Sequence, residues 1–267
     1  MNEQDRNKTV NVGLSELAKE ISNFNANVSQ ILNTVMNGLS SFKIDFPIED
    51  IGRLITLWVE RHADTCQKFS VIMVGAGWPP LSQFDLYLSE MESVVTQYVN
   101  DASSIQAVVD EFVMSKYDDE KIVSLLNEWK ESDWLKKRIP IIQEIVESHI
   151  QGKYCVAIPA LLPQIEGIIT ERFGHTGNLK GENYKNYAKK ILNDKDKWSF
   201  DKIAEDFLLN VVLVTFEHGN KLNSSLSRHA ILHGADVRYG TKANSIKCIM
   251  LFDYLQNKFD VVITPSR

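Results

Sequence analysis

Apolar residues recur at helical spacing along most of this 267-residue chain, and this pattern restricts the fold more than any other feature. The first series spans residues 14–35 and consists of Leu14, Leu17, Ile21, Phe24, Val28, Ile31 and Val35. Steps of three and four residues place such side chains on one face of a helix. The apolar–polar alternation typical of strands is almost absent. The pattern therefore predicts an all-α fold, in which this first helix either packs on its own domain or serves dimerisation.

Proline and glycine divide the rest of the chain into further helices. We expect them at residues 48–69, 83–100, 104–115, 119–129, 141–150, 154–173, 184–192, 199–216, 227–233 and 242–258. Gly75–Pro80 (GAGWPP) predicts a loop with its tryptophan packed underneath, and Pro159 and Pro163 predict a helix start or kink. The Lys136–Arg138 triplet before Pro140 has the composition of a solvated helix end. We place a boundary there, between a helical N-terminal region (1–138) and a C-terminal helical bundle (139–267).

Composition indicates a soluble, cytoplasmic protein. No apolar run is long enough to span a membrane, and the polar N-terminus lacks the apolar region of a signal peptide. Cys66, Cys155 and Cys248 form no CxxC pair, which predicts buried free thiols. The net charge is −6, yet residues 174–267 hold 14 Lys/Arg against 10 Asp/Glu. An acidic protein with this asymmetry can still carry a locally positive site.

The segment Arg228–His233 (RHAILH) is where a fixed cation and titratable imidazoles lie closest together. Arginine binds phosphate through its planar fork, and histidine exchanges protons near neutrality. Such groups can cleave RNA without a metal, because a base, an acid and a cation suffice for attack by the 2′-hydroxyl. Two alternatives remain open. His229 and His233 could bind zinc, or Arg228 could pair with a carboxylate while the histidines satisfy hydrogen bonds in the core.

The same segment resembles the HEPN superfamily, whose signature is an arginine, four to six residues and a histidine. Residues 154–167 (YCVAIPALLPQIEG) and 238–255 (RYGTKANSIKCIMLFDYL) resemble stretches of HEPN-like proteins from prokaryotic defence systems. The resemblance covers about residues 140–260. It implies a dimeric helical bundle with a composite, metal-independent endoribonuclease site, often in a toxin or abortive-infection protein. Arg228 would then grip the scissile phosphate, His233 would be the general acid/base, and His229 a secondary contact.

Three further residues are candidates from their own chemistry. Glu166 lies in an apolar stretch, so its carboxylate needs a cation, which is either Arg228 or another Lys or Arg. Tyr239 and Lys242 are close enough in sequence to contact the RNA backbone. The expected partners are RNA, a second copy through the C-terminal half, and a regulatory or antitoxin protein, with no cofactor or metal. The alternative function is a non-catalytic helical dimerisation or interaction module.

Overall fold

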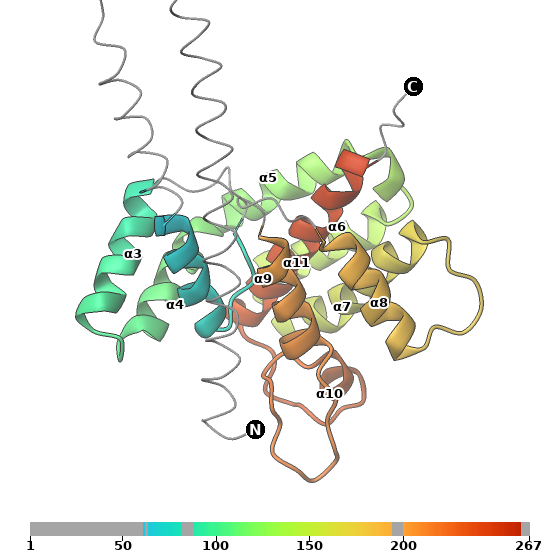
Figure 1. Cartoon of the computed structure of the whole chain (residues 1–267). Coiled ribbons are helices and arrows are strands. Elements are labelled where there is room, and N and C mark those ends of the chain that lie inside the picture. Colours follow the sequence, from blue (N-terminus) through green and yellow to red (C-terminus); the bar gives the residue numbers. More distant parts are fainter. Residues whose placement is uncertain (1–60, 62–63, 82–87, 194–199, 263–267) are drawn as a thin grey trace, which may run out of the picture. The chain divides into compact units, whose positions relative to one another are not determined.

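The computed structural model describes residues 61, 64–81, 88–193 and 200–262 of the chain. Every regular element within these ranges is a helix, which confirms the predicted all-α fold (Figure 1). The chain divides into two compact units, one of residues 1–67 with 195–199, the other of residues 68–194 with 200–267. The expected helix at 14–35, most of the one at 48–69 and the first residue of the one at 199–216 lie outside the described residues. The candidate site belongs to the second unit.

The helices of the second unit follow the order of the apolar segments in the sequence. Residues 64–75 are helical. They are followed by α3 (Leu88–Asn100), α4 (Ile105–Lys116), α5 (Asp119–Lys130), η2 (Asp133–Leu135), α6 (Ile139–Ile150), α7 (Tyr154–Arg172), α8 (Gly181–Ile191), α9 (Asp201–Phe207), the π-helical turn η3 (Leu208–Val212), α10 (Arg228–Leu232) and α11 (Lys242–Val262). The segment expected to be helical up to Phe216 thus ends at Val212, after a π turn closed by the Leu213 N–H on the Leu208 carbonyl (2.8 Å).

Helix α7 runs through both of its prolines, so of the start or kink expected at Pro159–Pro163 the start is wrong. The helix begins at Tyr154 instead. A proline at position i has no N–H for the carbonyl at i−4, so Pro159 leaves the carbonyl of Cys155 without its helical partner. The hydroxyl of Tyr239 donates to this carbonyl at 3.1 Å. A side chain from a distant segment therefore satisfies the acceptor that the proline leaves open, and the helix continues.

The core of the unit is built around α7 and α11, which pack against each other. Helix α7 also packs against α6, α8 and α10. The fully buried side chains of these two helices include Ile158, Ile165, Ile168, Ile169, Ile246, Leu251, Phe252 and Leu255. Burial of each aliphatic or aromatic side chain of this size contributes about 1.5–3 kcal/mol, so the two helices dominate the stability of the unit.

The expected boundary near residue 138 falls inside the second unit. Helix α5 packs on α6, and α4 packs on α11. Trp129 of α5 donates from Nε1 to Asp253 of α11 at 2.8 Å, and both side chains are buried. After Gly75, which ends the preceding helix, the rest of the GAGWPP segment is a loop, as predicted, and its Trp78 is completely buried. Helices on both sides of residue 138 therefore share one core.

Two composition-based expectations can be checked on the described residues. None of the helices described there combines the length and apolar character that crossing a membrane demands. None of the three cysteines is in a disulfide, as predicted, but only Cys248 is buried, whereas Cys66 is half-buried and Cys155 is exposed. The expectation of burial is wrong for Cys155 because it faces outward on the first turn of α7.

Candidate functional site

Short-range hydrogen bonds fix both ends of α10, the single-turn helix that carries the candidate residues. Ser227 is the N-cap, and its Oγ accepts the N–H of Ala230 at 3.2 Å. At the other end Gly234 has φ 73°, a conformation that L side chains disfavour. There the Ala235 N–H reaches the Ala230 carbonyl (2.8 Å), which closes the helix in a Schellman motif. Arg228 and His233 thus lie at opposite ends of one rigid turn.

Arg228 forms an ion pair with Glu166 of α7. The contact joins Nη2 of Arg228 to Oε2 of Glu166, and the two side chains are about equally exposed, at 21% and 22%. The cation that pairs with Glu166 is therefore Arg228, not another Lys or Arg. Tyr184 of α8 is buried nearby: burial and the Glu166 charge raise the pKa of its hydroxyl, while Arg228 acts in the opposite direction. The pair anchors α10 to α7 and holds the guanidinium at the protein surface.

The two histidines of α10 differ in their surroundings. Their rings are nearly parallel (5°) with centroids 6.3 Å apart. His233, at the C-cap, is exposed and lies 6.2 Å from the ring of Phe216. His229 is half-buried; burial, followed by the charges of Arg228 and His233, lowers the pKa of its imidazole, and Glu166 opposes the shift. A lowered pKa keeps this imidazole neutral near pH 7, so it can accept a proton or a hydrogen bond.

Tyr239 and Lys242 lie away from the Arg228–Glu166 pair. The hydroxyl of Tyr239 is bound to the carbonyl of Cys155, eleven residues before Glu166 on α7 and therefore roughly 16 Å along the helix. Lys242 is exposed on the first turn of α11, where its charge acts on His149 at the end of α6. The structure thus brings Arg228, His229, His233 and Glu166 together but places Tyr239 and Lys242 elsewhere.

Asn244 is a positioning residue that the sequence reasoning missed. Its side-chain amide donates to the carbonyls of Ser225 (3.0 Å) and Tyr239 (2.9 Å), and so joins the segments before and after α10. The residue is buried, and its N–H donates to Oγ1 of Thr241 at 3.1 Å at the start of this helix. A polar residue within the apolar pattern of α11 was the signal that could have identified it.

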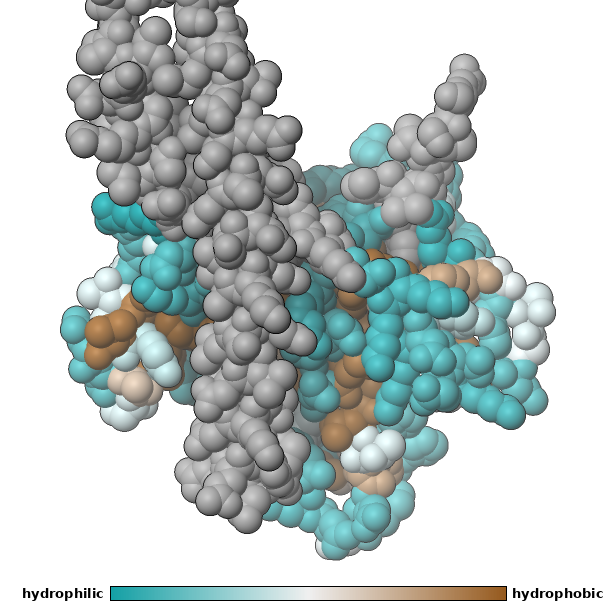
Figure 2. All heavy atoms as spheres, in the orientation of Figure 1, coloured by the Kyte–Doolittle hydropathy of each residue, from teal (hydrophilic) through white to brown (hydrophobic). Residues whose placement is uncertain are grey.

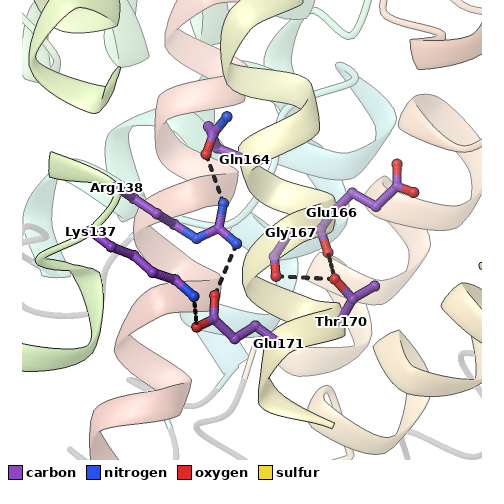
Figure 3. A network of polar contacts seen from close by, with 7 residues as sticks. All are labelled: Lys137, Arg138, Gln164, Glu166, Gly167, Thr170 and Glu171. Carbon is purple, nitrogen blue, oxygen red and sulfur yellow. Dashed lines mark hydrogen bonds and ion pairs between the residues drawn. The ribbon is translucent and has the colours of Figure 1, made fainter. Parts of the chain in front are cut away.

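Arg138 is a second missed residue, on the opposite side of α7 from Arg228. It donates to Gln164 (2.8 Å) and Glu171 (2.9 Å), whereas Glu166 points away from this network (Figure 3). Burial disfavours the Glu171 charge, but hydrogen bonds from Lys137 and Arg138 prevail and lower the pKa of its carboxyl. The triplet is therefore not simply a solvated helix end.

Gly167 explains how Arg138 approaches α7 so closely. A Cβ at this position would lie 2.7 Å from both terminal guanidinium nitrogens, closer than real Cβ contacts allow. The absence of a side chain lets the guanidinium lie against the helix backbone between Gln164 and Glu171. Helix α7 is thus held by Arg138 on one face and by Arg228 on another.

The arrangement on α10 offers one cation, one exposed imidazole and one neutral imidazole, which can bind an anion and move protons. Among the residues that the structure describes, no three His, Cys, Asp or Glu side chains lie close enough to hold a metal. Asp236, the nearest acidic residue to the histidines in sequence, accepts the backbone N–H of Arg238 (2.8 Å). Comparison with known proteins shows no family model, no curated protein and no solved structure that matches the chain.

Proposed function

We propose that this protein is a metal-independent RNA endonuclease of the HEPN type, acting as a toxin or phage-defence effector under the control of a regulatory or antitoxin protein. The observation that carries the proposal is the single-turn helix α10. It holds Arg228 against Glu166 at one end and exposes His233 at the other, with His229 parallel to His233 between them. The resemblance in sequence supplies the reaction class, and this geometry supplies groups suited to it.

The proposed reaction needs only these groups and RNA. A histidine takes the proton of the ribose 2′-hydroxyl, the 2′-oxygen attacks the adjacent phosphorus, and the bond from phosphorus to the 5′-oxygen breaks. A second histidine, already protonated, gives its proton to the departing 5′-oxygen. The products are a 2′,3′-cyclic phosphate and a 5′-hydroxyl. Arg228 stabilises the negative charge on the phosphoryl oxygens through terminal guanidinium N–H groups that the Glu166 contact leaves unused.

The reaction requires an acid and a base, and a second copy of the chain provides the second set. His233 is the acid/base in each copy, and His229 makes a secondary contact. Two-fold dimers are the commonest oligomers, and a two-fold axis beside α10 would bring the motifs of both copies together. Light scattering of the full chain at micromolar concentration is expected to give the dimer mass. A strictly monomeric mass would contradict the composite site.

The decisive experiment compares RNA cleavage by the wild type and the His233→Ala variant in the presence of a divalent-metal chelator. Wild type is expected to cleave RNA to 2′,3′-cyclic phosphate ends and to leave DNA intact, and the variant is expected to be inactive. Lys130→Ala, at an exposed residue of α5, is the control and should cleave as the wild type does. Activity lost with chelator and restored by zinc would assign the chemistry to His229 and His233 as metal ligands instead.

One observation favours the alternative, a non-catalytic dimerisation or interaction module. Arg228 is already paired with Glu166 within the chain, as a structural ion pair would be. The two functions separate in the same assay. Full cleavage by His233→Ala would show that the RNase activity comes from elsewhere, and absence of cleavage by a dimeric wild type would favour the module.

A further inference from the structure

A second surface beside α10 has the composition of a nucleic-acid binding site. Residues 172–192, which end α7 and include α8, contain five Lys/Arg and a single acidic residue in a chain of net charge −6. The surface over α8 is mostly hydrophilic (Figure 2). Lys189 and Lys190 of α8 are exposed, and Lys185 is half-buried. None of the three is needed for the core, because α8 buries Tyr184 and Ala188 instead.

Aromatic rings lie at one edge of this basic surface. Phe173, at the end of α7, stacks on Tyr187 of α8 with ring centroids 4.4 Å apart and planes within 11°. Both rings are partly exposed. Tyr187 is held in place by a 2.9 Å hydrogen bond between its hydroxyl and Nδ1 of His175. A preformed ring surface of this kind can receive a base, since every base presents a π-face.

The lysines connect the ring pair to the candidate cleavage site. Nζ of Lys190 lies 5.9 Å above the ring of Phe173, so a cation is already beside the rings. Lys185 and Lys189 are four residues apart and share a strip of the helix surface. Helices α8 and α10 both pack against α7, and the positive charge of Lys185 acts on the imidazole of His229. The rings and the three lysines therefore form one basic surface over α8, on the same helix, α7, that carries α10.

We propose that the outer face of α8 binds single-stranded RNA, with Lys185, Lys189 and Lys190 on the phosphates and a base stacked at Phe173–Tyr187, and leads the strand to α10. The proposal rests on the proposed nuclease function and names the form of its substrate. Single strands are favoured because bases inside a duplex are not free to stack on the rings. An acidic or phosphorylated protein would use the lysines but would have no use for the rings.

The test measures binding separately from cleavage. The full-length His233→Ala variant with chelator is titrated against a labelled single-stranded RNA of mixed sequence and against the matching duplex, with fluorescence anisotropy as the readout. Adding Lys189→Gln and Lys190→Gln is expected to weaken single-strand binding about tenfold and to reduce the dependence of log K on log salt by about 0.7 for each phosphate that the variant no longer binds. Lys130→Gln with Lys136→Gln, two exposed lysines outside α8, is the charge-matched control and should bind normally.

A pair of Tyr187 variants measures how much ring stacking contributes to RNA binding. Tyr187→Leu removes the ring and Tyr187→Phe keeps it, while both lose the hydrogen bond to His175. Tyr187→Leu is expected to bind single-stranded RNA about tenfold more weakly than Tyr187→Phe. Equal affinities of these two variants, or equal affinity for the duplex, would overturn the proposal in favour of a site for any polyanion.

The two proposals fail in different ways. If wild type cleaves RNA but the α8 lysine variant binds like its control, the α8 site is wrong and the nuclease stands. If RNA is never cleaved but the α8 variants lose affinity as expected, the binding site stands without the catalytic function.

Discussion

At the residue scale, Arg228 combines a structural contact with an open donor set. Its ion pair with Glu166 ties α10 to α7, and the side chain remains partly exposed. A guanidinium carries five N–H donors, so one carboxylate does not exhaust it. The same residue can therefore orient α10 and bind a phosphate at once, and its planar fork does so in a bidentate geometry that a lysine ammonium lacks.

Replacement of Arg228 by lysine is expected to lower the RNA cleavage rate at least about tenfold although the charge is retained. The reason is loss of the fork that binds carboxylate and phosphate together. Initial rates with chelator would measure the effect, and circular dichroism would show that the fold is intact. Arg238→Lys, at an exposed arginine outside α10, is the control and should leave the rate unchanged. A wild-type cleavage rate in Arg228→Lys would show that bidentate binding of the phosphate by Arg228 is not part of the mechanism.

At the scale of elements, α7 is the helix on which the candidate site depends. Arg138 lies on one face over Gly167, and Arg228 binds Glu166 on another. Near its start, the hydroxyl of Tyr239 binds the carbonyl freed by Pro159. These contacts come from segments before and after α7 in the chain. They set the position of Glu166 relative to α10 more firmly than apolar packing alone would.

The link between Pro159 and Tyr239 predicts a coupling that a double-mutant cycle can measure. Tyr239→Phe is expected to lower the free energy of unfolding by up to about 1 kcal/mol, because the Cys155 carbonyl loses its donor. With Pro159→Ala in place, the alanine N–H supplies that carbonyl, and the loss on Tyr239→Phe should shrink. Urea unfolding of the four proteins would show it, with Tyr98→Phe, an exposed tyrosine, as control. Equal losses in both backgrounds would mean that the hydroxyl does not replace the helical bond.

At the scale of the whole second unit, two buried titratable groups join other helices to α11. His149 of α6 shares a 2.7 Å hydrogen bond with Ser245, and burial lowers the pKa of its imidazole to about 4. Asp253 accepts from Trp129 of α5, and burial raises the pKa of its carboxyl to about 6. Burial thus favours the neutral form of both groups, and acid acts on them in opposite directions.

The pH dependence of stability follows from these two shifts. As pH falls from 6.5 to 4, His149 is protonated in the unfolded protein but stays neutral in the folded one. Protonation therefore favours the unfolded state, and the contribution of His149 to the free energy of unfolding is lost. As pH falls through 6, Asp253 takes up a proton in the folded protein while it is still ionised in the unfolded one, so the free energy of unfolding rises. This gain is lost again as pH rises through 6. Relative to wild type, Asp253→Asn should therefore lose more stability between pH 6.5 and 4.5, and His149→Gln less, each by about 1–2 kcal/mol.

Denaturant unfolding of the three proteins across this pH range would measure the differences. The comparison with wild type removes the contribution of the other carboxylates, which all three share. Asp253→Asn should also be the more stable protein at pH 7, where the wild-type carboxylate is buried and charged. Parallel pH profiles for all three proteins would show that neither group titrates differently on folding.

The sequence by itself determined the helices and the local geometry of α10. Apolar spacing predicted the ends of α5, α7 and α11 to within a few residues, because a helix that buries one face has apolar residues about every 3.6 positions. The turn at Gly234 and the buried Trp78 are likewise short-range features. The sequence left two alternatives for the partner of Glu166, Arg228 or another Lys or Arg, since a carboxylate in an apolar stretch needs a cation but does not specify which.

Tertiary structure alone decided the contacts between segments far apart in the chain. Arg138 belonged to a triplet typical of a solvated end, yet it lies on α7 because Gly167 leaves space there. Pro159 predicted a helix start or kink, yet α7 begins at Tyr154 and runs through Pro159, and Tyr239 donates to the carbonyl that this proline leaves open. Helices before residue 138 share the core of those after it because Trp129 reaches Asp253. Local periodicity records which residues are buried, whereas the partner of a buried polar group depends on chain topology, which no short-range pattern contains.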